Sequence, residues 1–247
     1  MAINVARVPY LNTEPFYFDM ERRGIQLRDM TPNLIANAAA RGEIDAGPIP
    51  VTDCPRLEPD FRTLSGFCIA SVSRAGSSFL HSEKPIQDLA GARIGVPGED
   101  GTSADLLRVL LELRYQVQPQ AYVDPEEPYD AFLLTGNQGL RRRRGVRGYP
   151  HRYDLGEEWQ QWTGLPFVFA RWMVRTDMDP KEVALLEDAL FVGQEDWVDG
   201  LYRMSGPRDG LLMQPRDVLE YIQGYRYFMG VPEERSIDLF RQYLDQL

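Results

Sequence analysis

Histidine and cysteine are scarce in this 247-residue sequence, which has two of each, and their scarcity limits its chemistry. Cys54 and Cys68 are too few for a disulfide framework or a metal-ligand cluster, so we expect two free thiols. His81 and His151 stand outside any metal-binding spacing such as HExxH, which favours a structural or surface role for each. The sequence also lacks a Gly-x-Ser-x-Gly elbow, a Walker loop and a GxGxxG after a strand. No motif therefore indicates a metal or an organic cofactor.

Positively charged residues are fewer than negatively charged ones, and long apolar runs are absent from the sequence. The chain has 27 Lys and Arg against 37 Asp and Glu, a net charge of −10, which argues against general nucleic-acid binding. No apolar run approaches the roughly 18 residues of a membrane span, and the first ten residues lack the features of a signal peptide. We therefore expect a cytoplasmic protein with neither a membrane nor a nucleic-acid partner. The sequence leaves the oligomeric state open.

Short apolar strands alternate with helices along the first third of the chain. Residues 3–8 and 25–30 read as strands, and a helix is expected between them, from Thr13 to about Arg23. A second helix is expected between clear start and stop signals, with Thr31 as N-cap, Pro32 at the first helical position and Gly42 past the end. Such alternation predicts an α/β protein with mixed sheets covered by helices.

Two long extended stretches, residues 61–80 and 166–174, divide the chain into lobes. We expect a discontinuous first lobe, residues 1–80 plus 171–247, and an inserted second lobe, residues 81–170. This layout is typical of two-lobed proteins that close on a small ligand in the cleft between the lobes. The C-terminal part is expected to be wholly helical, with helices from Asp179, at 215–229 and at 232–246. The inward stripe of the first of these comprises Val183, Leu186, Leu190, Trp197 and Leu201.

Polar residues at turns are the candidates for ligand binding. The strand at 3–8 runs directly into Val8–Phe16, and strand ends of open α/β sheets are where ligands bind. Thr102 and Ser103 open a predicted helix, where free N–H groups and hydroxyls suit an anion, although ordinary capping explains them equally well. Asn137 can cap the helix that follows it.

The first extended stretch, residues 61–80, which crosses from one lobe to the other, and a run of arginines contain further candidates. Ser73, Arg74, Ser77 and Ser78 lie on an extended segment whose alternate side chains face either the cleft or solvent. Five arginines between residues 141 and 147 are expected to form a solvated helix end. The alternative is a positive rim that attracts an anionic metabolite.

Five segments, taken in order, resemble the menaquinone-biosynthesis family of the futalosine pathway (MqnA/MqnD), closest to its chorismate dehydratase branch. They read RVPYLNTEP, ARGEIDAGPIPVTD, GTSADLLRVLLE, AFLLTGNQGL and YDLGEEWQQWTGLPFVFARW and span most of residues 5–174. The resemblance implies a type II periplasmic-binding-protein-like fold with a cleft between lobes, and no metal or organic cofactor. It also implies a carbon–oxygen lyase (hydro-lyase) that removes water from the dicarboxylate chorismate to give 3-[(1-carboxyvinyl)oxy]benzoate.

The same resemblance implies roles for individual residues. Asn12 corresponds to the family's site asparagine and Ser77 to its site serine, so both are expected to be catalytic, while Thr102 and Ser103 would hold a substrate carboxylate. No protein base stands out, and a carboxyl group of the substrate could serve instead. The remaining candidates for substrate contact are Tyr10, Thr13, Pro48, Arg74, Ser78 and Asn137.

This chain departs from the family pattern at two of these positions. The family usually has Gly-Asp where this chain has Gly136 and Asn137, and the segment before Ser77 gains Arg74. These changes motivate an alternative, a non-catalytic binding protein for a small anionic cyclic or aromatic carboxylate. A third possibility is the sister activity on dehypoxanthine futalosine, for which no base-like histidine stands in a matching segment.

Overall fold

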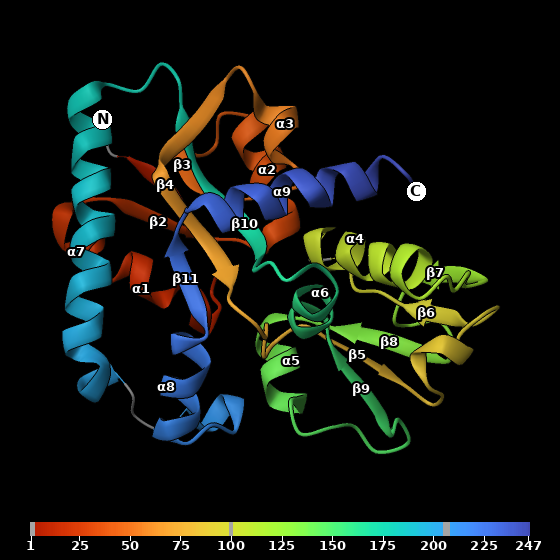
Figure 1. The fold of residues 1–247 in the computed structure, drawn as a ribbon. Helices are drawn as coiled ribbons and strands as arrows, with labels where there is room; N and C mark the ends of the chain where they lie inside the picture. Colours follow the sequence, from red (N-terminus) through yellow and green to blue (C-terminus); the bar gives the residue numbers. More distant parts are fainter. Residues whose placement is uncertain (1–2, 99–100, 205–207) are drawn as a thin grey trace.

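Two mixed β-sheets, each with its own helices, form the two lobes of the protein (Figure 1). The computed structural model describes residues 3–98, 101–204 and 208–247, without the side chains of residues 197–204 and 209. The larger sheet has six strands in the order β11-β4-β10-β3-β1-β2, and the smaller has five in the order β7-β6-β8-β5-β9. The α/β expectation is therefore confirmed.

The strands of the larger sheet are β1 (Asn4–Arg7), β2 (Gln26–Asp29), β3 (Ala46–Pro50), β4 (Phe61–Ser71), β10 (Phe167–Arg175) and β11 (Tyr225–Phe228). Those of the smaller sheet are β5 (Phe79–Ser82), β6 (Arg93–Gly95), β7 (Ala121–Val123), β8 (Ala131–Leu134) and β9 (His151–Asp154). β1 runs parallel to β2 and β3, whereas β10 runs antiparallel to β3 and β4.

The helices are α1 (Glu14–Tyr17), α2 (Pro32–Ala40), α3 (Cys54–Leu57), α4 (Gly101–Val109), α5 (Gly136–Arg142), α6 (Leu155–Thr163), α7 (Pro180–Met204), α8 (Pro215–Gln223) and α9 (Val231–Leu244). A 3-10 turn, Leu11–Thr13, precedes α1, a π-helical turn, Leu110–Arg114, continues α4, and a 3-10 turn, Asp209–Leu211, precedes α8. Across the described residues, no helix combines the length and hydrophobicity needed to cross a bilayer.

The chain passes between the sheets in two short segments. It leaves β4 at Ser71 and enters the smaller sheet at Phe79, and it returns from α6 to the larger sheet at Phe167. The limits expected from the sequence, at residues 80 and 170, thus fall inside β5 and β10. Each crossing lies a few residues earlier in the chain than the sequence indicated.

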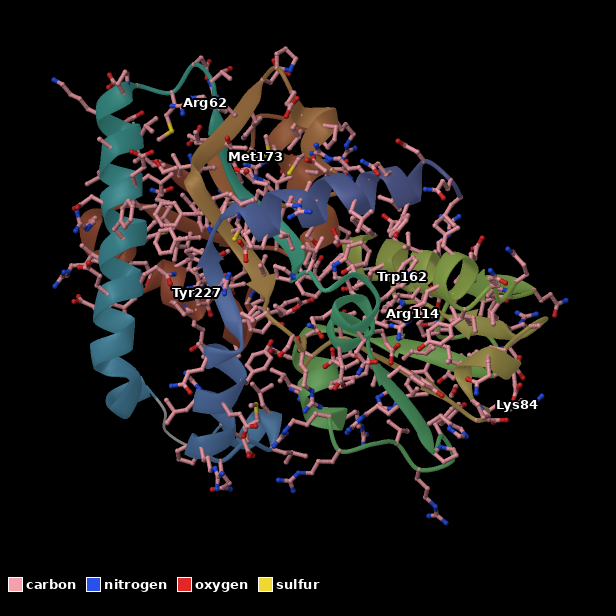
Figure 2. All side chains as sticks on the ribbon, in the orientation of Figure 1. Arg62, Lys84, Arg114, Trp162, Met173 and Tyr227 are labelled. Atoms are coloured by element: carbon pink, nitrogen blue, oxygen red, sulfur yellow. The ribbon has the colours of Figure 1, made fainter. Side chains whose placement is uncertain are left out.

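One apolar cluster lies mainly in the larger lobe, and another fills the second lobe and extends to β4 and β10 of the larger sheet. Phe16, Trp172 and Leu186 belong to the cluster between the larger sheet and α7, a region filled with side chains in Figure 2. Val183, Leu186 and Leu190 are buried as the helical period predicted, whereas the side chains of Trp197 and Leu201 lie outside the described residues.

The C-terminal helix α9 ties the lobes together. Its residues Ile237 and Phe240 are buried in the apolar cluster of the second lobe, and the Phe240 ring lies edge-on to Trp159 of α6 with 5.7 Å between centroids. The Trp159 indole N–H also donates to Ser236 Oγ at 3.1 Å. The helix that follows β11 of the larger sheet thus packs on the second lobe and connects the lobes in addition to the two crossings.

Two of the predicted helices are wrong in part. The helix expected from Thr13 to Arg23 is split, because i→i+3 hydrogen bonds from Met20 N to Tyr17 O and from Arg23 N to Met20 O tighten the chain beyond α1. The helix expected at 215–229 ends at Gln223, and residues 225–228 form the edge strand β11 against β4. Pairing with a strand about 150 residues earlier overrides the local helical pattern.

Candidate functional site

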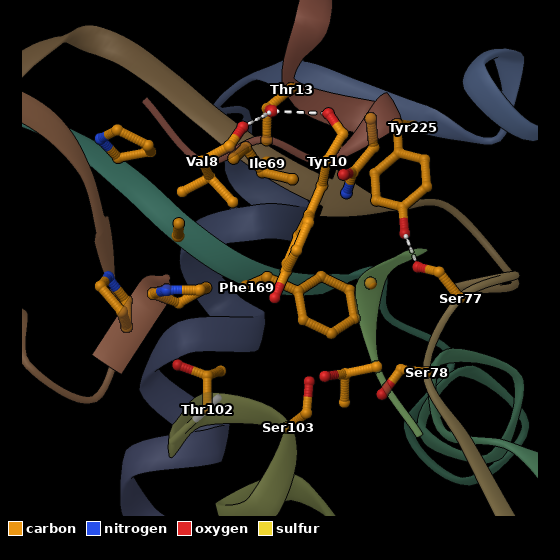
Figure 3. A pocket seen from close by; sticks show the side chains of 17 residues that line it. Val8, Tyr10, Thr13, Ile69, Ser77, Ser78, Thr102, Ser103, Phe169 and Tyr225 are labelled. Atoms are coloured by element: carbon orange, nitrogen blue, oxygen red, sulfur yellow. Dashed lines mark hydrogen bonds between the residues drawn. The ribbon is translucent and has the colours of Figure 1, made fainter. Parts of the chain in front are cut away.

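A cavity of about 550 Å³, its open mouth included, lies between the two lobes. Figure 3 shows side chains of both lobes pointing into it. Eight of the ten predicted site residues line it: Tyr10, Asn12, Thr13, Pro48, Ser77, Ser78, Thr102 and Ser103. Residues that the sequence did not single out also line it, among them Thr135, Gly136, Phe169 and Tyr225.

The turn after β1 is held rigidly and presents Asn12 to the cavity. The Thr13 hydroxyl is within hydrogen-bond distance of Val8 O (2.6 Å) and Tyr10 O (2.8 Å), which closes the turn. The Tyr17 hydroxyl accepts from Val8 N at 3.2 Å and donates to Ala6 O at 3.3 Å. Asn12 is 8% exposed, and its Oδ1 has no hydrogen-bond partner among the described residues. The amide oxygen is thus available to accept a hydrogen bond from a ligand.

Tyr10 connects this turn to the other lobe. Gly136, the first residue of α5, has φ of +54°, and a Cβ atom there would lie 2.6 Å from Cζ of Tyr10. Only glycine suits both the left-handed backbone and the contact with the ring. The Tyr10 ring therefore packs directly on the start of α5, across the cleft.

Ser77 lies on the first crossing in a chain of hydroxyl groups. It accepts from the Tyr221 hydroxyl at 2.9 Å and lies 3.3 Å from the Tyr225 hydroxyl, a contact drawn in Figure 3. Burial raises the pKa of Tyr225 to about 12, so this phenol stays protonated at neutral pH. The neighbouring Ser78 Oγ is buried and has no partner in the described part of the chain.

The start of α4 forms the opposite wall. Thr102 and Ser103 are each 1% exposed, and Thr102 Oγ1 lies 3.3 Å from Oγ1 of Thr52, which follows β3 in the first lobe. The N–H groups of a first helical turn have no partners within the helix, and the helix dipole favours negative charge there. Among the described cavity-lining side chains none is a carboxylate, an amine, a guanidinium or an imidazole. An anionic ligand would therefore be held by neutral donors.

Arg74 and Asn137 lie outside this cavity. The Arg74 side chain is 57% exposed, faces Glu157 at 3.7 Å and borders a second cavity on the other side of the crossing. Asn137 is the second residue of α5, whose N-cap position is occupied by Thr135, so the predicted capping by Asn137 is wrong. Its Nδ2 instead donates to Pro9 O at 3.0 Å.

Asp154 fixes the crossing that carries Ser77. Its carboxylate accepts from Ala75 N (2.8 Å) and Gly76 N (2.7 Å), and also from Gly156 N (3.0 Å) and Glu157 N (3.1 Å) at the start of α6. Burial raises the pKa of Asp154, and these backbone donors act in the opposite direction. The Asp residue of the YDLGEEW segment thus joins one crossing to the helix that leads to the other.

His81 and part of the arginine run make contacts that stabilise the fold. His81 is fully buried in the second lobe, and its ring stacks on Phe132 with 5.4 Å between centroids. The expectation of a solvated helix end is wrong for Arg143, whose side chain is only 16% exposed and pairs with Asp217 at 2.7 Å. Arg141 Nε donates to Gly210 O at 2.6 Å. The run thus joins α5 to the segment before α8.

The fold and the cleft define a periplasmic-binding-protein-like protein. The solved structure of AF1704 from Archaeoglobus fulgidus matches with a TM-score of 0.74 at 17% identity, over 99% of this chain and 97% of that one. The periplasmic aliphatic sulphonate binding protein SsuA of Escherichia coli matches with a TM-score of 0.62 at 12% identity, over 99% and 86%. At these identities the likeness concerns the fold, and the expected fold class is confirmed.

Within this fold class the chain belongs to the menaquinone biosynthesis family, whose family model matches residues 3–246. The chorismate dehydratase of Thermus thermophilus is 23% identical over an alignment 255 residues long, which covers 95% of this chain and 92% of that protein. The family suggested by the five sequence segments is thereby confirmed.

Proposed function

We propose that the protein eliminates water from chorismate to give 3-[(1-carboxyvinyl)oxy]benzoate, a step of menaquinone biosynthesis. The observation that carries this proposal is an interlobe cavity furnished with amide, hydroxyl and helix-start donors and with no acidic or basic side chain among its described lining residues. Because the product is aromatic, the elimination is strongly downhill. The protein then needs to orient the substrate and hold its charge more than to supply a strong acid or base.

Each part of the cavity has a role in this reaction. The start of α4, with Thr102 and Ser103, holds one carboxylate of the substrate. Asn12 Oδ1 accepts from a donor of the substrate, and the Ser77 hydroxyl donates to an oxygen of it. A proton leaves one ring carbon and the hydroxyl group leaves the adjacent one. The C–H electrons become a ring double bond, and the second substrate carboxylate takes up the proton and passes it to the departing hydroxyl to form water.

The direct test is incubation of the purified protein with chorismate, followed by chromatography for the aromatic product. Asn12→Ala and Ser77→Ala should each lower turnover at least about 100-fold, with little change in the free energy of unfolding. Asn37→Ala is the matched control, because Asn37 lies on α2 away from the cavity and contacts Arg56. A folded wild-type protein that forms no product would end the proposal, and full activity of either site variant would end the assignment of that residue.

Binding without turnover is the second candidate. It is favoured by Asn137, which stands where the family usually has Asp. The ligand would be a small cyclic or aromatic carboxylate. A thermal-shift series with chorismate and related acids separates the two candidates, since saturable stabilisation without product formation identifies a binding protein.

A further inference from the structure

The hydroxyl group of Ser77 belongs to a chain of hydrogen bonds whose other members come from the C-terminal part of the protein. Tyr221 on α8 donates to Ser77 Oγ at 2.9 Å, and Tyr225 on β11 donates to the carbonyl oxygen of Ala75 at 2.6 Å. Ser77 Oγ is 3.3 Å from the Tyr225 oxygen and 3.4 Å from Ala75 O. Two of these three hydroxyl groups, those of Ser77 and Tyr225, therefore lie within hydrogen-bond distance of the Ala75 carbonyl oxygen.

The directions of these bonds follow from the donors and acceptors available. A carbonyl oxygen can only accept, and Tyr225 makes the shortest contact to Ala75 O, so the Tyr225 proton points at that carbonyl. Tyr221 is 9% exposed, and its proton goes to Ser77. The geometry of this 2.9 Å contact makes Tyr221 the donor and Ser77 Oγ the acceptor.

The hydroxyl proton of Ser77 has no short hydrogen bond to an acceptor among the described residues. Its oxygen is engaged as an acceptor by Tyr221, and its remaining contacts within the chain are the long ones of 3.3 and 3.4 Å. Ser77 lines the interlobe cavity, whereas Tyr221 borders only the cavity on the other side of the crossing. A donor held by a neighbour in this way is aligned for an acceptor on the open side, and accepting one hydrogen bond strengthens the bond that it donates.

We propose that Tyr221 is a positioning residue that commits Ser77 to act as a hydrogen-bond donor toward an oxygen of the bound substrate. Tyr225 takes part by donating to the Ala75 carbonyl oxygen, which Ser77 Oγ approaches only at 3.4 Å. This inference rests on the proposed function for the identity of the substrate, but the direction of the Ser77 proton is independent of it. Both phenols remain donors at working pH, because burial raises their pKa values, that of Tyr225 to about 12.

The test combines Tyr221→Phe with a double-mutant cycle. Removal of the Tyr221 hydroxyl should lower kcat for chorismate dehydration about tenfold, while KM changes less than about threefold. In the Ser77→Ala background the same substitution should cause no further loss, because Tyr221 acts through Ser77. An equal, additive loss in both backgrounds, or unchanged kcat in Tyr221→Phe, would overturn the proposal.

Tyr227→Phe is the matched control. Tyr227 follows Tyr225 on the same strand, is labelled in Figure 2, and has a buried hydroxyl without a hydrogen-bond partner among the described residues. Its removal should leave kcat and KM unchanged. If Tyr227→Phe loses as much activity as Tyr221→Phe, loss of packing explains both, and the positioning role falls.

A neutron structure of the deuterated, ligand-free protein separates this proposal from the proposed function. The expected nuclear density places the Tyr221 deuteron on the line to Ser77 Oγ and the Ser77 deuteron toward the cavity. A Ser77 deuteron directed at Tyr221 would overturn the proposal even if the protein dehydrates chorismate. The expected density would support it even if chorismate proves to be the wrong ligand.

Discussion

Asn137 Nδ2 donates a hydrogen bond of 3.0 Å to the carbonyl oxygen of Pro9, and this bond joins the two lobes at the rim of the cavity. Pro9 precedes Tyr10, whose ring packs on the first residue of α5, and Asn137 is the second residue of that helix. Asn137 therefore makes a polar contact between α5 of the second lobe and the turn after β1 of the first.

Loss of the Asn137 amide should weaken ligand binding more than it weakens the fold. Asn137→Ala and Asn137→Asp both remove the donor to Pro9 O, so we expect chorismate affinity to fall about 3- to 10-fold, as for one hydrogen bond. Isothermal titration calorimetry measures the affinity in the Ser77→Ala background, where turnover is suppressed, with Gln138→Ala, an exposed neighbour on the same helix, as control. Unchanged affinity in both Asn137 variants would show that the bond contributes nothing to the liganded state.

Arg143 should contribute to stability, unlike its neighbour in the arginine run. Its guanidinium donates to Asp217 and to the carbonyl oxygens of Leu211 and Leu212. Arg143→Ala removes these three contacts, so the free energy of unfolding should fall by about 1–3 kcal/mol in urea titrations. The exposed Arg142 is the control, and its replacement by Ala should change stability by less than about 0.5 kcal/mol. Equal effects of the two substitutions would contradict the interpretation.

Gly139 should tolerate no side chain. A Cβ atom at this position of α5 would lie 2.0 Å from the carbonyl oxygen of Ser77, so Gly139→Ala forces the helix and the first crossing apart. We expect a loss of about 1–3 kcal/mol in thermal or urea unfolding, together with lower activity because Ser77 moves. Gly98→Ala is the control, since no atom of the described residues lies within 4 Å of a Cβ there. A stable, active Gly139→Ala protein would mean that the contact is looser than described.

His81 should make the protein less stable as the pH falls from about 6.5 to 4. Burial, with a smaller effect from the charge of Arg152, lowers the pKa of His81 from 6.5 to about 4. Between these values the unfolded chain binds more protons than the folded one, so acidification favours unfolding, by about 3 kcal/mol in all. Above pH 6.5 the group adds no pH dependence.

Urea titrations between pH 4 and 7.5 measure this effect. His81→Leu should reduce the loss of stability on acidification by about that amount. Carboxylates contribute their own pH dependence, which both proteins share. Parallel profiles for the wild type and His81→Leu would contradict the prediction.

Much of the cavity could be anticipated because its residues lie where local rules place ligands. Asn12 follows a strand, and Thr102 and Ser103 open a helix, and both kinds of position are recognisable from short stretches of sequence. For an extended segment, however, the sequence does not show which of its side chains face the cavity. Ser77 and Ser78 face the cavity, but Arg74 on the same crossing turns to Glu157, and alternation alone could not decide which side faced the cleft.

Short stretches of sequence suffice for the alternation of strands and helices, the limits of α2 at Thr31 and Gly42, and most of the polar side chains around the cavity. These features depend on propensities and caps that act within a few residues. Long-range packing, by contrast, makes residues 225–228 a strand, brings Tyr221 and Tyr225 to Ser77, and directs Asn137 to Pro9 instead of to the cap of α5. Each of these contacts joins residues more than 100 positions apart, so no local pattern encodes it.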